Sequence, residues 1–104
     1  MLFLAIAIAQ PVAAQSFKPD RKAGWDAYHK RDYATALRHW RPLAEQGDAD
    51  AQRRLGQMYR FGLGVTKDYK EAARWFRKAS DQGDANAQRW LGDIYHHGHG
   101  ITRD

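Results

Sequence analysis

Cysteine is absent from the sequence, which excludes a disulfide framework and any site that holds a metal through thiolates. Serine occurs only at Ser16 and Ser80, and neither the GxSxG nor the HExxH motif of common hydrolases is present. The glycine pairs within residues 62–64 and 98–100 are not followed by the Gly-Lys-Ser/Thr of a phosphate loop. We therefore predict that the protein is not an enzyme and needs no cofactor.

The first fourteen residues, MLFLAIAIAQPVAA, lack any charged side chain. An apolar stretch that ends in small residues, here Val12-Ala13-Ala14, is typical of a secretory signal peptide cut before Gln15, although no Lys or Arg precedes this one. The stretch is too short to span a bilayer, which takes about 20 apolar residues. We predict a signal peptide over residues 1–14, a periplasmic or secreted bacterial protein, and no stable membrane insertion after cleavage.

Blocks of like charge are also absent, although the net charge is +5 and the sequence pI is about 9.7. The charge is spread along the chain, and it permits weak attraction to anionic surfaces. A length of 104 residues allows one domain.

What the sequence does contain is a repeat with a period of 36 residues. Residues 51–68 and 87–104 are identical at ten of eighteen positions, and residues 32–52 and 68–88 at eleven of twenty-one. A fixed period of this length is typical of stacked-repeat proteins, which build binding surfaces more often than catalytic pockets.

Apolar residues at i, i+3, i+4 and i+7 predict amphipathic helices over residues 21–31, 33–46, 49–61 and 69–82, and a fifth that begins near residue 85. Gly47 and Gly83 suit left-handed helix ends. Aspartates suit the helix starts as N-caps, namely Asp48, Asp68 and Asp84. Pro42 falls inside the second helix and predicts a kink there.

Glycine recurs inside the first helix of each pair, at Gly24, Gly56 and Gly92. A glycine costs a helix about 0.5–1 kcal/mol relative to alanine, so its recurrence predicts that two helices cross closely at these points.

The run A-x-x-x-L-G-x-x-Y-x-x-G-x-G-V-x-x-D-Y-x-x-A-x-x-W-F-x-K-A over residues 51–79 resembles the Sel-one-like repeat. Residues 23–37 resemble its shorter relative, the tetratricopeptide repeat, with a link between the paired helices about four residues shorter. The resemblance covers residues 20–104. It implies an all-α fold, a right-handed superhelical stack of antiparallel helix pairs (an α-solenoid). Such proteins act as scaffolds or adaptors that bind a protein or peptide in a concave groove.

The repeat divides the chain into a short linker at 15–20, a first, tetratricopeptide-like repeat at 21–50, a Sel-one-like repeat at 51–86 and a partial third repeat at 87–104. The third repeat stops where its second helix should begin, and we expect it to be truncated.

The groove candidates implied by this resemblance lie on the first helix of each pair and form a basic and aromatic strip. They are Arg21, Trp25, Tyr28, Arg53, Gln57, Arg60, Phe61, Arg89, Asp93, His96 and His97. Such a strip would suit an acidic peptide or a C-terminal carboxylate, and the alternative is that these side chains are simply solvated. We expect the remaining stripe aromatics to form the core, namely Tyr33, Trp40, Tyr59, Tyr69, Phe76 and Tyr95, while Trp75 and Trp90 are less constrained.

Two other functions stay open. His96, His97 and His99 could bind zinc, copper or nickel, although residues 60–63 of the preceding repeat carry unrelated side chains at these places. The positive charge could instead bind an anionic membrane or polymer. Nucleic acid is not an expected partner, because an exported chain seldom meets it.

Overall fold

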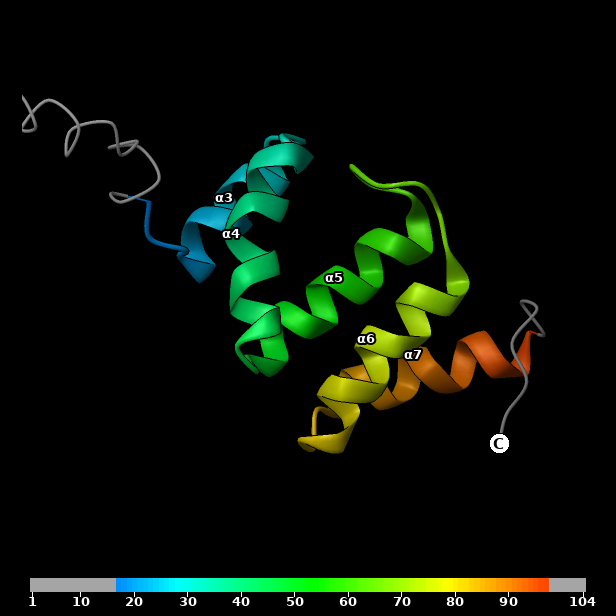
Figure 1. Ribbon diagram of the computed structural model, residues 1–104. Helices are drawn as coiled ribbons and strands as arrows, with labels where there is room; N and C mark the ends of the chain where they lie inside the picture. Colours follow the sequence, from blue (N-terminus) through cyan, green and yellow to red (C-terminus); the bar gives the residue numbers. More distant parts are fainter. Residues whose placement is uncertain (1–16, 98–104) are drawn as a thin grey trace, which may run out of the picture.

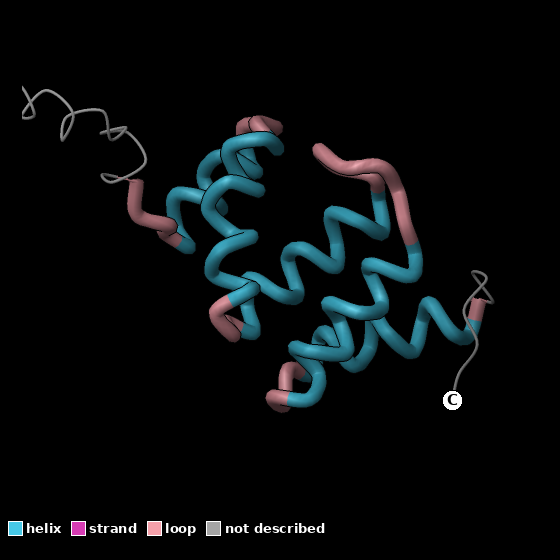
Figure 2. The backbone as a smooth tube through the Cα atoms, in the orientation of Figure 1, coloured by secondary structure: helices cyan, strands magenta, loops and turns pink. Residues whose placement is uncertain are grey.

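The computed structural model describes residues 17–97, and every regular element in that range is a helix (Figures 1 and 2). The five helices are α3 (Arg21–His29), α4 (Tyr33–Glu45), α5 (Ala49–Phe61), α6 (Tyr69–Asp81) and α7 (Ala85–His96). Each predicted helix is present, and the predicted ends are correct to within two residues. The predicted signal peptide lies outside the described residues, and the handedness of the superhelix stays a prediction.

An aspartate stands before every one of these helices and accepts a hydrogen bond from a backbone N–H of the first turn. The acceptor oxygen of Asp48 is 2.9 Å from the nitrogen of Ala51, and that of Asp84 is 2.8 Å from the nitrogen of Ala87. These bonds satisfy donors that a helix start leaves unpaired. The N-cap predictions for Asp48, Asp68 and Asp84 are thereby confirmed, and Asp20 and Asp32 act in the same way.

The turns follow the predicted pattern. Gly47 and Gly83 have φ values of 104° and 92° just after α4 and α6, a left-handed conformation that glycine adopts without strain. The link between α3 and α4 covers residues 30–32, whereas the link between α5 and α6 covers residues 62–68 and forms the long loop in Figure 2. The four-residue difference predicted between the first two repeats is therefore present. Pro42 lies in the last turn and a half of α4, which continues to Glu45.

Each helix packs against the next one along the chain, from α3 to α7. Trp40 and Phe76 are the largest fully buried side chains, and each lies against a glycine of the preceding helix. A Cβ on Gly24 would be 2.3 Å from the indole nitrogen of Trp40, and a Cβ on Gly56 would be 2.5 Å from the ring of Phe76. The predicted close crossings are confirmed at these two glycines. A Cβ on Gly92 would meet no described atom within 4 Å, so the third crossing is not found within residues 17–97.

The core assignments hold in part. Trp40 and Phe76 are buried as predicted, while Tyr33, Tyr59, Tyr69 and Tyr95 are only half-buried. Trp75, which the sequence left less constrained, is 3% exposed and joins the cluster formed with Trp40. Within the described part of the chain, no helix is long and apolar enough to cross a membrane.

Candidate interaction surface

The predicted groove residues that belong to a helix all lie on α3, α5 and α7, and His97 caps the end of α7. These are the first helices of the successive pairs (Figure 1). The fold therefore places the strip on equivalent elements, but their side chains differ in exposure and in partners. Phe61, Arg89 and His96 are exposed, while Trp25, Tyr28, Gln57 and Asp93 are half-buried.

Three of the predicted arginines form ion pairs that join one first helix to the next. Arg21 of α3 lies 2.6 Å from Asp48, the N-cap of α5. Arg53 of α5 lies 3.1 Å from Asp84, the N-cap of α7. Arg60 also pairs with Asp93 of α7. Arg21 and Arg53 each precede the helix glycine by three residues, so the same ion pair recurs with the repeat.

The capping aspartates serve two helices at once because each uses its two oxygens separately. In Asp48, Oδ2 accepts from the nitrogen of Ala51 and Oδ1 accepts from Arg21. In Asp84, Oδ1 accepts from the nitrogen of Ala87 and Oδ2 accepts from Arg53. One carboxylate thus starts a helix and fixes the preceding first helix against it.

These pairs limit which arginines a partner can reach. The side chains of Arg53 and Arg60 are only 14% and 15% exposed, whereas that of Arg21 is 61% exposed. Arg89, in the register of Arg53, hydrogen-bonds among the described residues to Asn86 of its own helix, at 3.0 Å. The role of these residues in binding a partner stays a prediction, and Arg53 and Arg60 have a structural task in addition.

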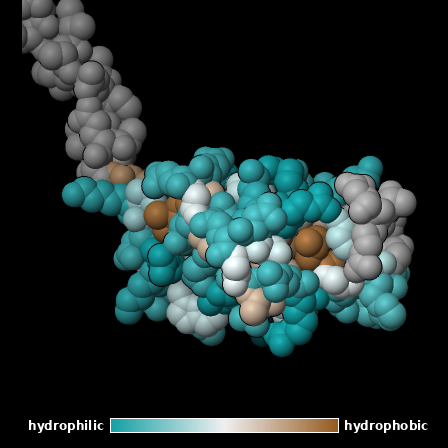
Figure 3. All heavy atoms as spheres, turned by 90° about the horizontal axis from the view of Figure 1, so that it is seen from below, coloured by the Kyte–Doolittle hydropathy of each residue, from teal (hydrophilic) through white to brown (hydrophobic). Residues whose placement is uncertain are grey.

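Phe61 is the large hydrophobic side chain that stands out on the described surface, with 52% exposure. Its ring lies edge-on to Trp90, with 6.4 Å between the centroids. The guanidinium of Arg60 lies over both rings, 5.1 Å from Phe61 and 4.7 Å from Trp90. An aromatic group held beside a cation and left open to solvent is the type of anchor that protein interfaces use. Figure 3 shows one face of the molecule, largely hydrophilic with small separate apolar patches.

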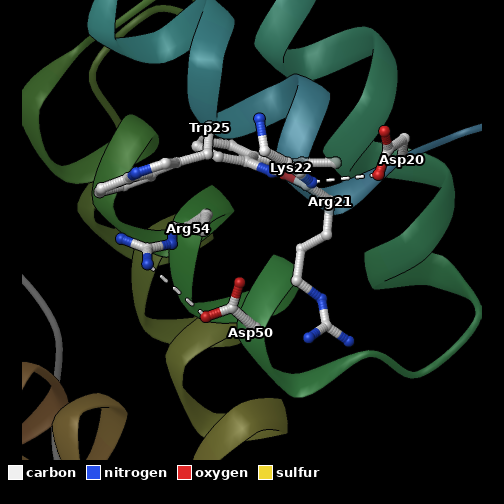
Figure 4. Close-up of a pocket in the computed structure, with 7 residues that line it drawn as sticks. Asp20, Arg21, Lys22, Trp25, Asp50 and Arg54 are labelled. Carbon is white, nitrogen blue, oxygen red and sulfur yellow. Dashed lines mark hydrogen bonds and ion pairs between the residues drawn. The ribbon is translucent and has the colours of Figure 1, made fainter.

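A cleft of about 480 Å³ opens between α3 and α5 (Figure 4). The guanidinium of Arg54 lies 4.1 Å from the ring of Trp25. In Figure 4, Asp50 lies beside Arg54, and Arg21 lies on the other side of Asp50. The cleft therefore has an aromatic wall and several charged groups. Its lining consists of Asp20, Arg21, Lys22, Trp25, Trp40, Asp50 and Arg54.

Arg54 is the least compensated cation of this cleft. Its closest carboxylate oxygen, on Asp50, is 3.7 Å away, which is too far for a hydrogen bond. The same oxygen accepts a hydrogen bond from Arg53, and Nε of Arg54 is buried without a hydrogen-bond acceptor. Burial lowers the pKa of Arg54 below the ordinary arginine value, because lost hydration outweighs the attraction of Asp50.

A second cleft, of about 530 Å³, adjoins the first and shares Asp20 and Arg21 with it. Pro19 and Leu43 give it an apolar part, and Asp48 also lines it. Arg21, which pairs with Asp48, therefore lines both clefts, whereas Asp48 lines only the second.

Sequence reasoning found Arg21 and Trp25 in this region but missed Lys22, Asp50 and Arg54. The available signal was the register of the 36-residue repeat, in which Arg54 corresponds to Trp90. Because this position holds a cation in one repeat and an indole in the next, the contact between α3 and α5 differs from the contact between α5 and α7.

The histidine cluster is described only in part, because His99 lies outside residues 17–97. His96 and His97 are exposed at the end of α7, with their rings perpendicular and 5.3 Å apart. His97 Nδ1 is 3.1 Å from Asp93. Within the described residues, no three potential ligands converge on a metal position.

The Sel1 repeat model matches three consecutive segments, at residues 24–48, 49–84 and 85–104. The chain belongs to the Sel1 repeat family. The resemblance read from residues 51–79 is confirmed, although the matched Sel1 segments begin two or three residues away from the boundaries predicted from the period. Sel1 repeats are helical solenoid units that generally mediate protein–protein interactions. A search of curated proteins found no match.

Proposed function

We propose that this Sel1 repeat protein is exported and acts as a scaffold. It would hold a protein partner on the face formed by the predicted groove residues of α3, α5 and α7. The observation that carries the proposal is the exposed ring of Phe61, which Arg60 and Trp90 hold in place. A partner that covers this ring removes apolar area from water. Because its neighbours already fix the ring, little side-chain entropy is lost on binding.

We further propose that the partner segment is acidic. Within α3, α5 and α7 there are six Arg or Lys side chains and three Asp side chains. The capping aspartates offset part of this excess through Arg21 and Arg53. The cations of α3 and α5 near Trp25 are the part of the surface where an acidic segment would gain most.

Capture of the partner tests the scaffold proposal. Residues 15–104, immobilised through a C-terminal tag, are exposed to a periplasmic extract, and each captured protein is purified and titrated against the chain. We expect Phe61→Ala to weaken binding of the true partner at least tenfold, since truncation of a central aromatic anchor costs about 2 kcal/mol or more.

Lys78→Ala is the matched control, because Lys78 is exposed on α6. The control should bind like the wild type. Partners that bind the two variants equally would contradict a role for the surface around Phe61.

Export is tested by the mature N-terminus of the protein produced in its native host. We expect mass spectrometry of the periplasmic fraction to find a chain that begins at Gln15, because a signal peptidase cuts after small residues such as Ala14. A chain that keeps Met1 and stays in the cytoplasm would contradict the export proposal.

A further inference from the structure

Arg54 has hydrogen-bonding capacity that the described chain does not use. Arg53 and Arg74 each donate two hydrogen bonds to carboxylates. Arg54 donates none within hydrogen-bonding distance, although its side chain is only 21% exposed. Only Nε is buried without an acceptor. The terminal N–H groups are not among the buried unsatisfied atoms, so an incoming acceptor would gain charge-assisted hydrogen bonds from them.

The geometry around Arg54 selects the kind of acceptor. The guanidinium carbon of Arg54 lies over the ring of Trp25, 4.1 Å from its centroid, and this contact restricts where the guanidinium can present its N–H donors. A planar fork of N–H donors matches a carboxylate, which can accept two parallel hydrogen bonds. The half-buried indole of Trp25 provides apolar area next to that position.

The charges of the cleft agree with an anionic occupant. Arg21, Lys22 and Arg54 line it together with two carboxylates, Asp20 and Asp50. Asp20 caps α3, and Asp50 accepts a hydrogen bond from Arg53, which lies outside the lining. Both carboxylates thus already have partners, and Asp50, 3.7 Å from Arg54, compensates the charge of Arg54 only in part.

The next junction of the stack shows that this cleft is not a general gap between repeats. Between α5 and α7, Trp90 occupies the place that corresponds to Arg54. Its ring stacks on Phe76, with the centroids 6.5 Å apart and 16° between the planes. The indole fills that junction, whereas the junction of α3 with α5 keeps its cleft and its cation.

We propose that the cleft between α3 and α5 binds the side-chain carboxylate of a glutamate or aspartate in an extended partner segment. An apolar side chain of the same segment would occupy the adjoining cleft, against Pro19 and Leu43. This inference rests on the proposed function, because it names the chemical group by which the scaffold would recognise its partner.

The test uses two peptides that differ only in charge, acetyl-Gly-Leu-Gly-Glu-Gly-amide and its Gln counterpart. Each is titrated into the ¹⁵N-labelled chain, and the indole and guanidinium N–H signals are followed by NMR. We expect the Glu peptide to shift the signals of Trp25 and Arg54 saturably and to bind about tenfold more tightly than the Gln peptide, as one charge-assisted hydrogen bond provides. Trp75 and Trp90 should not respond.

Arg54→Gln should abolish the difference between the two peptides. Within the described residues Arg54 has only a 3.7 Å ion pair with Asp50 and its contacts with two indole rings, so we expect the variant to stay folded. Arg74→Gln is the matched control. Arg74 also lies over an indole, 4.6 Å from Trp75, but Glu71 already accepts its hydrogen bonds, so this variant should discriminate like the wild type.

Equal affinity for the two peptides, no binding of either, or shifts confined to Trp90 would each overturn the inference. The peptide comparison on the wild-type chain decides the matter even if Arg54→Gln does not fold. A partner whose binding falls with Phe61→Ala but not with Arg54→Gln would overturn this inference and leave the scaffold function standing. Loss with Arg54→Gln alone would support the inference and contradict the role given to Phe61.

Discussion

At the scale of single residues, a glycine and an aromatic ring act as one unit in each complete pair of helices. The rings of Trp40 and Phe76 occupy the space that a side chain at Gly24 or Gly56 would need. The sequence predicted the close approach because glycine recurs in register. It could not show that Gly92, in the same register, would meet no described ring.

This difference gives a matched pair of substitutions. We expect Gly56→Ala to lower the free energy of unfolding by about 1–3 kcal/mol, because the new Cβ would overlap the fully buried ring of Phe76, which must then shift. Gly92→Ala should raise it slightly, by up to about 0.5–1 kcal/mol, through helix propensity alone. Urea unfolding followed by circular dichroism measures both. Equal effects of the two changes would contradict contact with the ring of Phe76 as the reason why position 56 needs a glycine.

At the scale of the helices, the boundaries could be predicted because their causes are local. Asp68 stands directly before α6 and Gly83 directly after its C-cap, and each can be read without knowing the rest of the fold. Contacts between helices could not be read in this way. Gln52 is buried, donates to the carbonyl of Ala44 at 3.1 Å and accepts from Gln82 at 2.9 Å. Nothing in its own sequence neighbourhood distinguishes it from the exposed Gln88 of the next repeat.

Asp68 offers a test of the local causes, since its side chain accepts hydrogen bonds from the nitrogens of both Lys70 and Glu71. We expect Asp68→Ala to destabilise the protein by about 1 kcal/mol and Asp68→Asn to keep most of that stability, because asparagine also caps helices well. Asp81→Ala, at the opposite end of α6, should be neutral or slightly stabilising, because a carboxylate is unfavourable near a helix C-terminus. Thermal unfolding of the three variants gives the comparison, and an unchanged midpoint for Asp68→Ala would contradict the role of the cap.

At the scale of the whole molecule, the sequence placed the candidate surface on the correct helices but did not reveal how its arginines are used. Asp84 is 31 positions from Arg53, and Asp93 is 33 positions from Arg60. Asp84 was recognisable as a cap, but its second oxygen becomes an acceptor for Arg53 only when the repeats stack. Arg54 was missed for a related reason, since the repeat register equates it with a tryptophan that fills the next junction.

The ion pair between Arg53 and Asp84 should therefore stabilise the stack, and a double-mutant cycle with Arg53→Gln and Asp84→Asn measures it. Asparagine can still cap α7, so the cycle separates the pair from the cap. We expect a coupling of about 1–2 kcal/mol that persists in 1 M salt, because both side chains are about 15% exposed and partly buried charges are screened little. The pair of Lys22 with Asp26 is the control, because it is 81% and 52% exposed and should couple more weakly and lose that coupling in salt. If the Arg53–Asp84 pair couples as weakly as the Lys22–Asp26 pair, little free energy holds Arg53 to Asp84. A partner could then bind Arg53 directly, as the groove hypothesis predicted.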